Sequence, residues 1–166
     1  MKLKITLFFF FTFNVALIGQ SLQLSQFAEI SVLTVGPGAS LNDAFGHSGF
    51  RVKDTMFKMD IVFGYGQYDF DTPNFYLKFA QGKLNYLMSV HEYQDFYDSY
   101  VYYNRTIDEQ VLNLSAEQKQ ALFNQLATNY QPENRAYLYD FFYDNCATRI
   151  RDMVEDTSQP KVAFTT

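Results

Sequence analysis

Alternating and β-branched apolar segments, separated by short polar turns, predict an antiparallel sheet in this chain. Five segments carry that pattern: 29–35, 48–53, 59–65, 84–90 and 106–112. The turn at 54–58 joins the second segment to the third, so these two are expected to form a hairpin. A further stretch, 136–143, is expected to be extended.

Apolar residues at helical spacing predict four helices, at 74–81, 92–102, 116–130 and 146–155. The first follows Asp71-Thr72-Pro73, a capping residue with proline at the first helical position. The third opens with a capping box at 115–118, and Asp144 or Asn145 caps the fourth. The whole pattern predicts one α+β domain with four to five strands and about four helices.

The first nineteen residues are typical of a secretory signal peptide, with Lys2 and Lys4 ahead of an apolar run and Gly19 at its end. The alternative is an uncleaved N-terminal anchor. Export would bring the chain into an oxidising compartment, where its single cysteine has no internal disulfide partner. The expected divisions are a leader at 1–19, a polar joint at 20–29, a domain at 30–155 and a frayed tail at 156–166.

Composition narrows the range of partners. The net charge of −5 becomes more acidic once the two leader lysines are removed, so a nucleic-acid partner is not expected. The chain has no zinc-ligand spacing and no glycine-rich phosphate loop, and we expect neither a metal nor a cofactor. Aromatic residues make up 19% of the chain, which fits either core packing or a surface that meets lipid or protein.

The candidate chemistry centres on Cys146, which follows Asp144 and Asn145 at an expected helix start. A helix N-terminus favours the thiolate, so we expect the thiol pKa to lie below its usual value of about 8.5. His47 is the expected base, at the start of a strand and within one hydrogen bond or one water of the sulfur. His91 is the alternative histidine, and its place beside a polar residue indicates a solvated loop. The opposing hypothesis is that the cysteine is a small buried apolar residue without chemistry.

Tyr65 is a candidate third member of the site. If the hairpin turn centres on Met56, His47 and Tyr65 lie opposite each other on neighbouring strands. The Tyr65 hydroxyl, or Gln67 or Asp69 just beyond it, would then orient the imidazole. The alternative is that Tyr65 only packs.

Other candidates flank the cysteine. Backbone amides at the helix start, near Asn145 and Ala147, are the expected oxyanion donors. Arg149 and Arg151 follow the cysteine and are candidates for lipid or phosphate binding. The alternative for both arginines is a salt bridge to a neighbouring aspartate.

The order of the two motifs, histidine early and cysteine late, is that of circularly permuted papain-like folds. Five segments together resemble the N-terminal periplasmic domain of the Lnb-type lipoprotein N-acyltransferases: 31–38, 44–48, 65–75, 79–86 and 139–149. The resemblance covers about 30–155. It implies a circularly permuted papain-like fold that performs acyl transfer in the periplasm, with His47 and Cys146 at the family's histidine and cysteine positions.

The resemblance also implies partners. The acyl donor would be a phospholipid, the acceptor the N-terminal amine of a lipoprotein, and the place of work the membrane surface. Aromatic residues would line an apolar groove for the acyl chain: Phe45, Tyr65, Phe141, Phe142 and Tyr143. Family members usually continue into membrane segments, whereas this sequence ends at Thr166, so we expect either a truncated form of a longer chain or a short member of the family. Two other functions stay open, a thiol amidase or peptidase of the cell wall and a noncatalytic binding domain.

Overall fold

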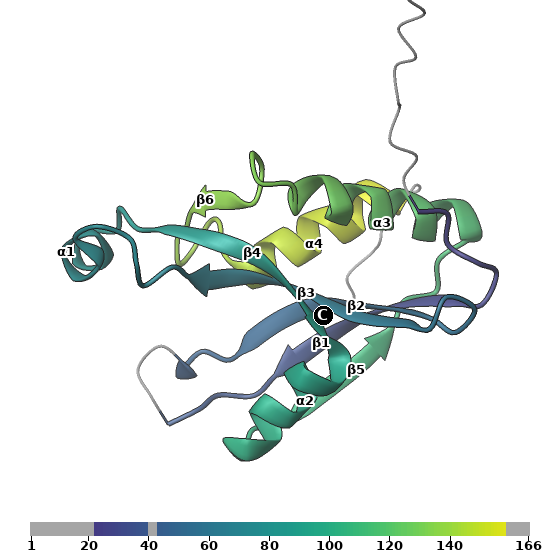
Figure 1. Cartoon of the computed structure of the whole chain (residues 1–166), viewed down its shortest axis with the longest axis horizontal. Helices are drawn as coiled ribbons and strands as arrows, with labels where there is room; N and C mark the ends of the chain where they lie inside the picture. The colour runs from purple at the N-terminus through teal and green to yellow at the C-terminus, as the bar shows by residue number, and fades with distance from the viewer. Residues whose placement is uncertain (1–21, 40–42, 159–166) are drawn as a thin grey trace, which may run out of the picture.

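A six-stranded antiparallel sheet forms the centre of the molecule (Figure 1). The computed structural model describes residues 22–39 and 43–158. The neighbour order across the sheet is β5-β1-β2-β3-β4-β6. The strands are β1 (Ala28–Val35), β2 (His47–Asp54), β3 (Met59–Tyr68), β4 (Asn85–Glu92), β5 (Ile107–Val111) and β6 (Ala136–Leu138).

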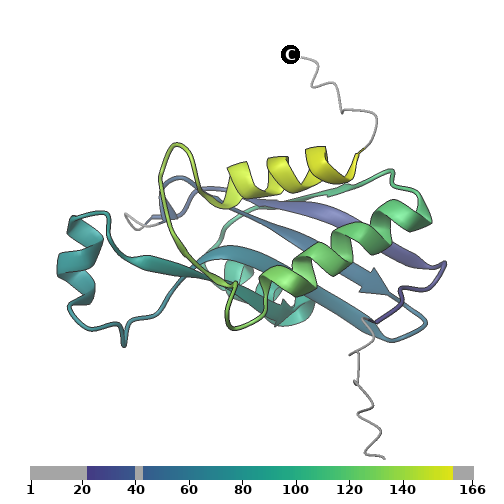
Figure 2. The same ribbon diagram turned by 90° about the horizontal axis from the view of Figure 1, so that it is seen from above.

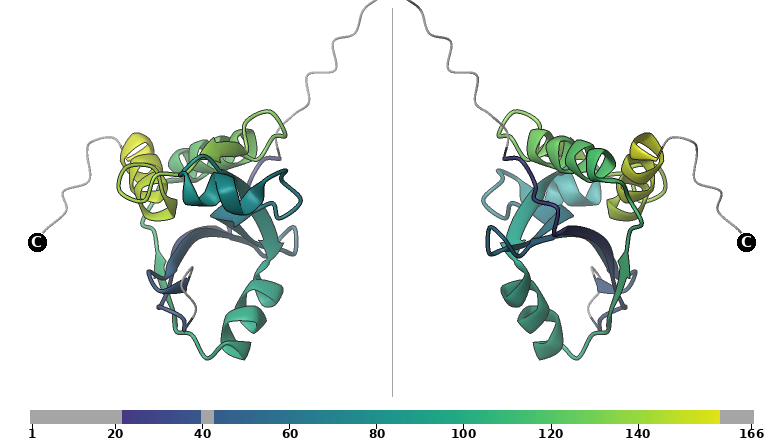
Figure 3. Two further views of the ribbon diagram at one scale, coloured as in Figure 1. Left: turned by 90° about the vertical axis from the view of Figure 1, so that its left-hand side faces the viewer. Right: turned by 90° about the vertical axis from the view of Figure 1, so that its right-hand side faces the viewer.

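Four helices in the described part of the chain complete the fold: α1 (Phe75–Ala80), α2 (Tyr93–Tyr102), α3 (Ala116–Asn129) and α4 (Cys146–Thr157). Helices α3 and α4 lie side by side over one face of the sheet, and α2 lies against the other face (Figure 3). Helix α1 extends beyond the end of β3 and β4 and has no buried residue (Figure 2). The predicted α+β class, antiparallel sheet and helix number are confirmed.

One prediction about the fold has a different outcome, and others stay untested. The stretch expected to be extended at 136–143 contributes a sixth strand, β6, of only three residues. A papain-like circular permutation stays a prediction that this architecture is compatible with. The expected leader at 1–19 and the end of the expected tail, 159–166, lie outside the described residues.

Side chains alternate between two hydrophobic cores because successive strand residues point to opposite faces. Phe63 of β3 belongs to the larger core under α3 and α4, together with Leu122 and Ile150 from those helices. Its neighbour Val62 belongs to the smaller core under α2, where it meets Phe96. This alternation decides on which side of the sheet each residue of the candidate site lies.

The two central strands part at one end. The pairing of β2 with β3 runs from Asp54 and Met59 at the turn to Gly49 and Gly64, and it stops before the first two residues of β2. Strand β3 continues alongside β4 with an irregularity at Gly66, whose φ of 99° is left-handed. Such a bulge bends its strand. The parted strands leave room at this end for a helix start to reach the sheet.

Side-chain caps set the starts of α3 and α4, whereas α1 and α2 begin without one. The predicted capping box of α3 is present, with Ser115 and Gln118 bonded to each other's backbone amides. The predicted start of α1 at Asp71 is wrong, because α1 begins after Asn74 without a side-chain cap. The amide of Asp71 instead donates to the Asp69 side chain, which holds the preceding residues in a turn.

Candidate active site

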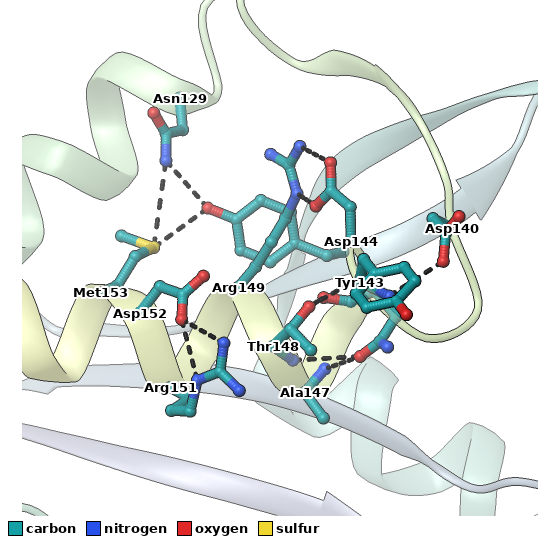
Figure 4. A network of polar contacts seen from close by, with 12 residues as sticks. Asn129, Asp140, Tyr143, Asp144, Ala147, Thr148, Arg149, Arg151, Asp152 and Met153 are labelled. Carbon is teal, nitrogen blue, oxygen red and sulfur yellow. Dashed lines mark hydrogen bonds and ion pairs between the residues drawn. The ribbon is translucent and has the colours of Figure 1, made fainter.

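Helix α4 begins at Cys146, as predicted, because Asn145 caps it. The Asn145 Oδ1 accepts hydrogen bonds from the amides of Ala147 and Thr148, each at 3.0 Å. The Thr148 hydroxyl in return accepts from the Asn145 amide at 2.9 Å. This reciprocal pair satisfies free donors of the first turn, among them the amides of Ala147 and Thr148 (Figure 4). The cysteine therefore occupies the first helical position.

The loop before the cap closes on itself. The Asp140 side chain accepts hydrogen bonds from the amides of Phe142 and Tyr143, at 2.8 and 2.9 Å. The backbones of Asp140 and Asp144 exchange two further hydrogen bonds of 3.0 and 3.1 Å. This closed loop, part of which Figure 4 shows at Asp140 and Tyr143, fixes the direction in which the chain enters α4. The same loop therefore sets the position of the thiol.

The Cys146 sulfur is half-buried and receives backbone donors from two elements. The amides of Ser48 in β2 and of Ala147 and Cys146 in α4 all favour the thiolate. Burial outweighs them and raises the pKa of the Cys146 thiol above its ordinary value. The expectation of a lowered thiol pKa is therefore wrong for the free domain, because loss of solvation exceeds the effect of the helix start.

His47 is the first residue of β2, as predicted. Gly46 before it has a φ of 76°, and a Cβ there would lie 2.5 Å from the Val35 carbonyl oxygen. Only glycine fits this turn without strain, and the turn sets the direction in which the chain enters the strand. The turn thus places His47 at the end of the sheet where β2 and β3 are no longer paired.

The His47 ring lies on the α2 side of the sheet. It stacks at 6.5 Å between ring centres with Tyr100, and a Cβ on Gly64 would lie 3.3 Å from its Nε2. Burial, aided by the positive charge of Arg105, lowers the pKa of His47 to about 4, although Asp43 acts in the opposite direction. The imidazole is therefore neutral near pH 7 and has a ring nitrogen able to accept a proton.

Cys146 and His47 line the same cavity, although their side chains pack against different neighbours. The cysteine packs against the core under α3 and α4, whereas the histidine lies against α2. Both line one cavity of about 570 Å³. No hydrogen bond joins the His47 ring to the Cys146 sulfur among the described residues, so the expected approach through one water stays a prediction.

Most of the remaining cavity wall falls into an aromatic part and a polar part. The aromatic part includes Phe45 and Phe141, whose rings meet edge to face at 4.6 Å, and extends to Phe79 on α1. The polar part lies on the α2 side and includes Ser89 and Arg105. The site can therefore hold a molecule with one apolar and one polar portion next to the thiol and the imidazole.

Comparison with known families identifies the chain at this point. The family model of the Lnb N-terminal periplasmic domain matches residues 19–166. The chain belongs to this family. Searches among curated proteins and among solved structures gave no match. The predicted resemblance is confirmed, and the chain is a periplasmic domain of an Lnb-type protein.

The structure places Tyr65 of this Lnb domain away from His47. The hairpin pairs Asp54 with Met59, which shifts the register by one residue from the prediction and points the two side chains to opposite faces. The Tyr65 hydroxyl accepts from Asn129 at 2.9 Å and donates to the sulfur of Met153 at 3.1 Å (Figure 4). Tyr65 lines the cavity with its ring, but it does not orient the imidazole.

The apolar groove has a different lining from the one predicted. Phe45, Tyr65 and Phe141 line the cavity, as expected. Phe142 and Tyr143 do not, and their side chains are 74% and 82% exposed. The closed loop before α4 turns these two rings outward. Residues from β3, β4 and α1, which the cysteine motif does not reveal, take their place in the wall: Tyr68, Phe79 and Tyr86.

Both candidate arginines have protein partners. Arg149 is bonded through Nε and Nη2 to the Asp144 carboxylate, with the second bond at 2.7 Å, and its guanidinium stacks 3.7 Å above the Tyr137 ring. Arg151 is bonded to its exposed neighbour Asp152. Neither arginine lines the cavity. Both arginines therefore form the salt bridges that the alternative hypothesis predicted. Neither guanidinium faces the cavity in which a phosphate group would lie.

The two candidates for the oxyanion site are also engaged. The Asn145 side chain caps the helix and donates to the Phe141 carbonyl, and the Ala147 amide donates to that cap. The amides of Ser48 and Cys146 also favour negative charge on the sulfur, which makes them further candidates for this role. Sequence reasoning missed Ser48, because a backbone amide leaves no signature in the residue type.

Arg105 is another residue that sequence reasoning missed. It precedes β5 and reaches His47 only because β1, β2 and β5 are neighbours in the sheet. A lone basic residue in a loop gives no signal of this kind.

None of the helices within residues 22–39 and 43–158 is long and apolar enough to cross a membrane. No group of three or more His, Cys, Asp or Glu side chains in that part of the chain is arranged to hold a metal ion.

Proposed function

We propose that this Lnb-family domain transfers an acyl group through a thioester on Cys146, with His47 as the base. The observation that carries the proposal is a thiol and a neutral imidazole on the wall of one cavity that is largely aromatic. Cysteine nucleophiles require a neighbouring base when their own pKa is not lowered. A neutral imidazole supplies that base.

The first half-reaction forms the thioester. The Cys146 sulfur attacks the carbonyl carbon of an ester, and a ring nitrogen of His47 takes the thiol proton, directly or through one water. The amides of Ser48 and Cys146 lie where they favour negative charge beside the sulfur. The carbon–oxygen bond of the ester then breaks, and the imidazolium returns its proton to the leaving alcohol.

The second half-reaction moves the acyl group to an amine. The neutral amine attacks the thioester carbon and gives a proton to His47 as the carbon–nitrogen bond forms. The carbon–sulfur bond breaks, and the Cys146 thiolate takes the proton back. The products are an amide and the free thiol. A phospholipid donor and the N-terminal amine of a lipoprotein as acceptor follow from the family resemblance.

The aromatic part of the cavity supports a lipid donor. It is lined by Tyr68, Phe79, Tyr86, Tyr139 and Phe141. Burial of each methylene group contributes about 0.8 kcal/mol, so even a short acyl chain would bind there measurably. The chain would lead directly to the thiol, because Phe141 and Cys146 line the same cavity.

Exposed aromatic and apolar residues on and near α1 support the proposal that the domain acts at a membrane surface. On α1, Tyr76 is 81% exposed and Leu77 57%, and neighbouring Phe70 is 68% exposed. Phe79 of the same helix lines the cavity. Aromatic side chains favour the membrane–water interface, where an apolar ring and a polar edge are both satisfied. Docking through α1 would bring the cavity to the lipid.

Intact mass spectrometry tests the proposal. The purified protein is incubated with a short-chain phospholipid dispersed in detergent, and the mass of the protein and the release of lysolipid are followed. We expect slow addition of one acyl group, with little transfer to a lipoprotein amine. The adduct should be absent from Cys146→Ala and much reduced in His47→Gln.

Two other results would favour one of the alternative functions, a cell-wall amidase or a noncatalytic binding domain. Cleavage of a cell-wall peptide without any acyl adduct from phospholipid would replace acyl transfer by amidase activity. A Cys146 thiol that reacts with alkylating agents only after unfolding would favour a noncatalytic domain.

A further inference from the structure

Arg105 carries a buried donor without a partner. Its side chain is only 5% exposed and lies in the wall of the cavity near His47. Its Nη2 is buried and, within the described part of the chain, has no hydrogen-bond partner. Buried guanidinium groups are nearly always fully bonded, because an unmade hydrogen bond to a charged group is costly. A ligand atom in the cavity would satisfy this donor.

The rest of the guanidinium is held firmly. Its Nε donates to the Gly36 carbonyl at 2.9 Å, and its Nη1 lies 3.2 Å from Asp43 Oδ1. The Tyr100 ring lies beneath it at 4.8 Å. These contacts fix the side chain before any ligand binds, so Nη2 is a preorganised donor.

Charge indicates which acceptor fits this donor. Asp43 already neutralises Arg105, and Asp95 lines the same side of the cavity. A phosphate there would face two carboxylates with only one guanidinium. A neutral carbonyl oxygen accepts the same hydrogen bond without repulsion.

We propose that the polar side of the cavity is a subsite for a peptide, whose main-chain carbonyl accepts a hydrogen bond from Arg105 Nη2. The opposite side is aromatic and suits an acyl chain, so the peptide and the chain would meet at Cys146 and His47. That this peptide is the acyl acceptor rests on the proposed function. Binding of the peptide itself does not.

Direct binding tests the subsite without catalysis. Glycylglycinamide, n-propylamine and glycerol phosphate are titrated into the Cys146→Ser protein and followed by NMR chemical shifts. We expect glycylglycinamide to bind more tightly than either other probe, because only it offers a neutral carbonyl near an amine. Arg105→Met should weaken its binding about tenfold or more, the usual effect of losing a hydrogen bond to a charged group.

Arg51 provides the matched control. It lies on the same face of the sheet, but its guanidinium is saturated by Asp60, Glu109 and the Tyr93 ring. It does not line the cavity, so Arg51→Met should leave peptide binding unchanged. If Arg105→Met does not fold, Arg105→Lys keeps a charge for Asp43 but cannot supply the second donor, and should also lose binding.

The outcomes separate the possibilities. Peptide binding that is absent, or that survives both Arg105 substitutions, overturns the subsite. Tighter binding of glycerol phosphate, lost in Arg105→Met, would make this a headgroup site and overturn it as well. Failure of thioester formation would refute the proposed function and leave the binding result standing.

Discussion

Tyr65→Phe should destabilise the domain, whereas the same substitution at Tyr137 should not. Both side chains are buried, at 1% and 8% exposure, and their rings lie 6.1 Å apart. The Tyr65 hydroxyl accepts a hydrogen bond from Asn129 at 2.9 Å and contacts the sulfur of Met153. The Tyr137 hydroxyl is buried with no partner among the described residues. The same substitution thus removes a hydrogen-bonded hydroxyl at Tyr65 and a hydroxyl without a partner at Tyr137.

The magnitudes follow from these contacts. Loss of a neutral hydrogen bond costs about 1 kcal/mol, and the Asn129 amide left without its acceptor adds to this, so Tyr65→Phe should cost about 1–2 kcal/mol. For a domain of this size the melting temperature should fall by roughly 3–6 °C. Tyr137→Phe removes a hydroxyl that is desolvated without compensation, so it should be neutral or stabilise by up to about 1 kcal/mol.

Thermal and denaturant unfolding, followed by circular dichroism, measures both variants. The rate of Cys146 alkylation serves as a second readout and should be unchanged in each, because neither hydroxyl contacts the thiol. Equal destabilisation by the two substitutions would refute the reasoning from hydrogen-bond satisfaction. Slower thioester formation in Tyr65→Phe without loss of stability would return Tyr65 to the catalytic site.

Three further substitutions or titrations test the site. Alkylation of Cys146 should rise with pH to a half-maximum above about 8.5, because burial raises the pKa of this thiol; a half-maximum below pH 7 would contradict that. The pKa of His47 is lowered to about 4 in the folded domain, so on acidification the unfolded chain binds this proton at a higher pH than the folded domain does. The free energy of unfolding should therefore fall as the pH drops from about 6.5 through 4, and His47→Gln should remove this pH dependence. Gly64→Ala would place a Cβ 3.3 Å from His47 Nε2 and should reduce thioester formation about tenfold or more with the melting temperature nearly unchanged; unaltered activity would show that the ring position is not critical.

Features decided by neighbouring residues were predictable from the sequence. The starts of α3 and α4 depend on side chains within three residues of the cap, Ser115 and Asn145, so their position follows from local chemistry. The strands at either side of the turn at 54–58 follow from alternation in the same way. Asp71 failed as a cap because Asp69, two residues earlier, bonds its amide in a competing turn.

Features decided across the sheet were not predictable. A shift of one residue in the hairpin register moves a side chain to the opposite face, and this removed Tyr65 from His47. The approach of Arg105 to the histidine depends on the order of β5, β1 and β2. No spacing in the sequence encodes a contact that passes through two strand pairings.

Electrostatics marks a second limit of sequence reasoning. The helix start at Cys146 was predicted correctly, but the direction of the pKa shift was not. A helix N-terminus stabilises a thiolate by a modest amount, whereas desolvation depends on all the atoms that surround the sulfur. Burial is a property of the packed fold, and so the sign of the shift had to come from the structure.

The two shifts together determine the resting state of the site. Burial raises the pKa of the Cys146 thiol and lowers that of the His47 imidazole, so both groups are neutral near pH 7. A stable thiolate–imidazolium pair would require a proton to move from the stronger base to the weaker one, which is unfavourable in the free domain. A neutral thiol is also a poor target for oxidation, which matters for a lone cysteine in an oxidising periplasm. In the proposed mechanism, proton transfer would occur only when a substrate carbonyl lies in the cavity, because the amides of Ser48 and Cys146 would then stabilise the charge that develops on its oxygen. The substrate itself would complete the site.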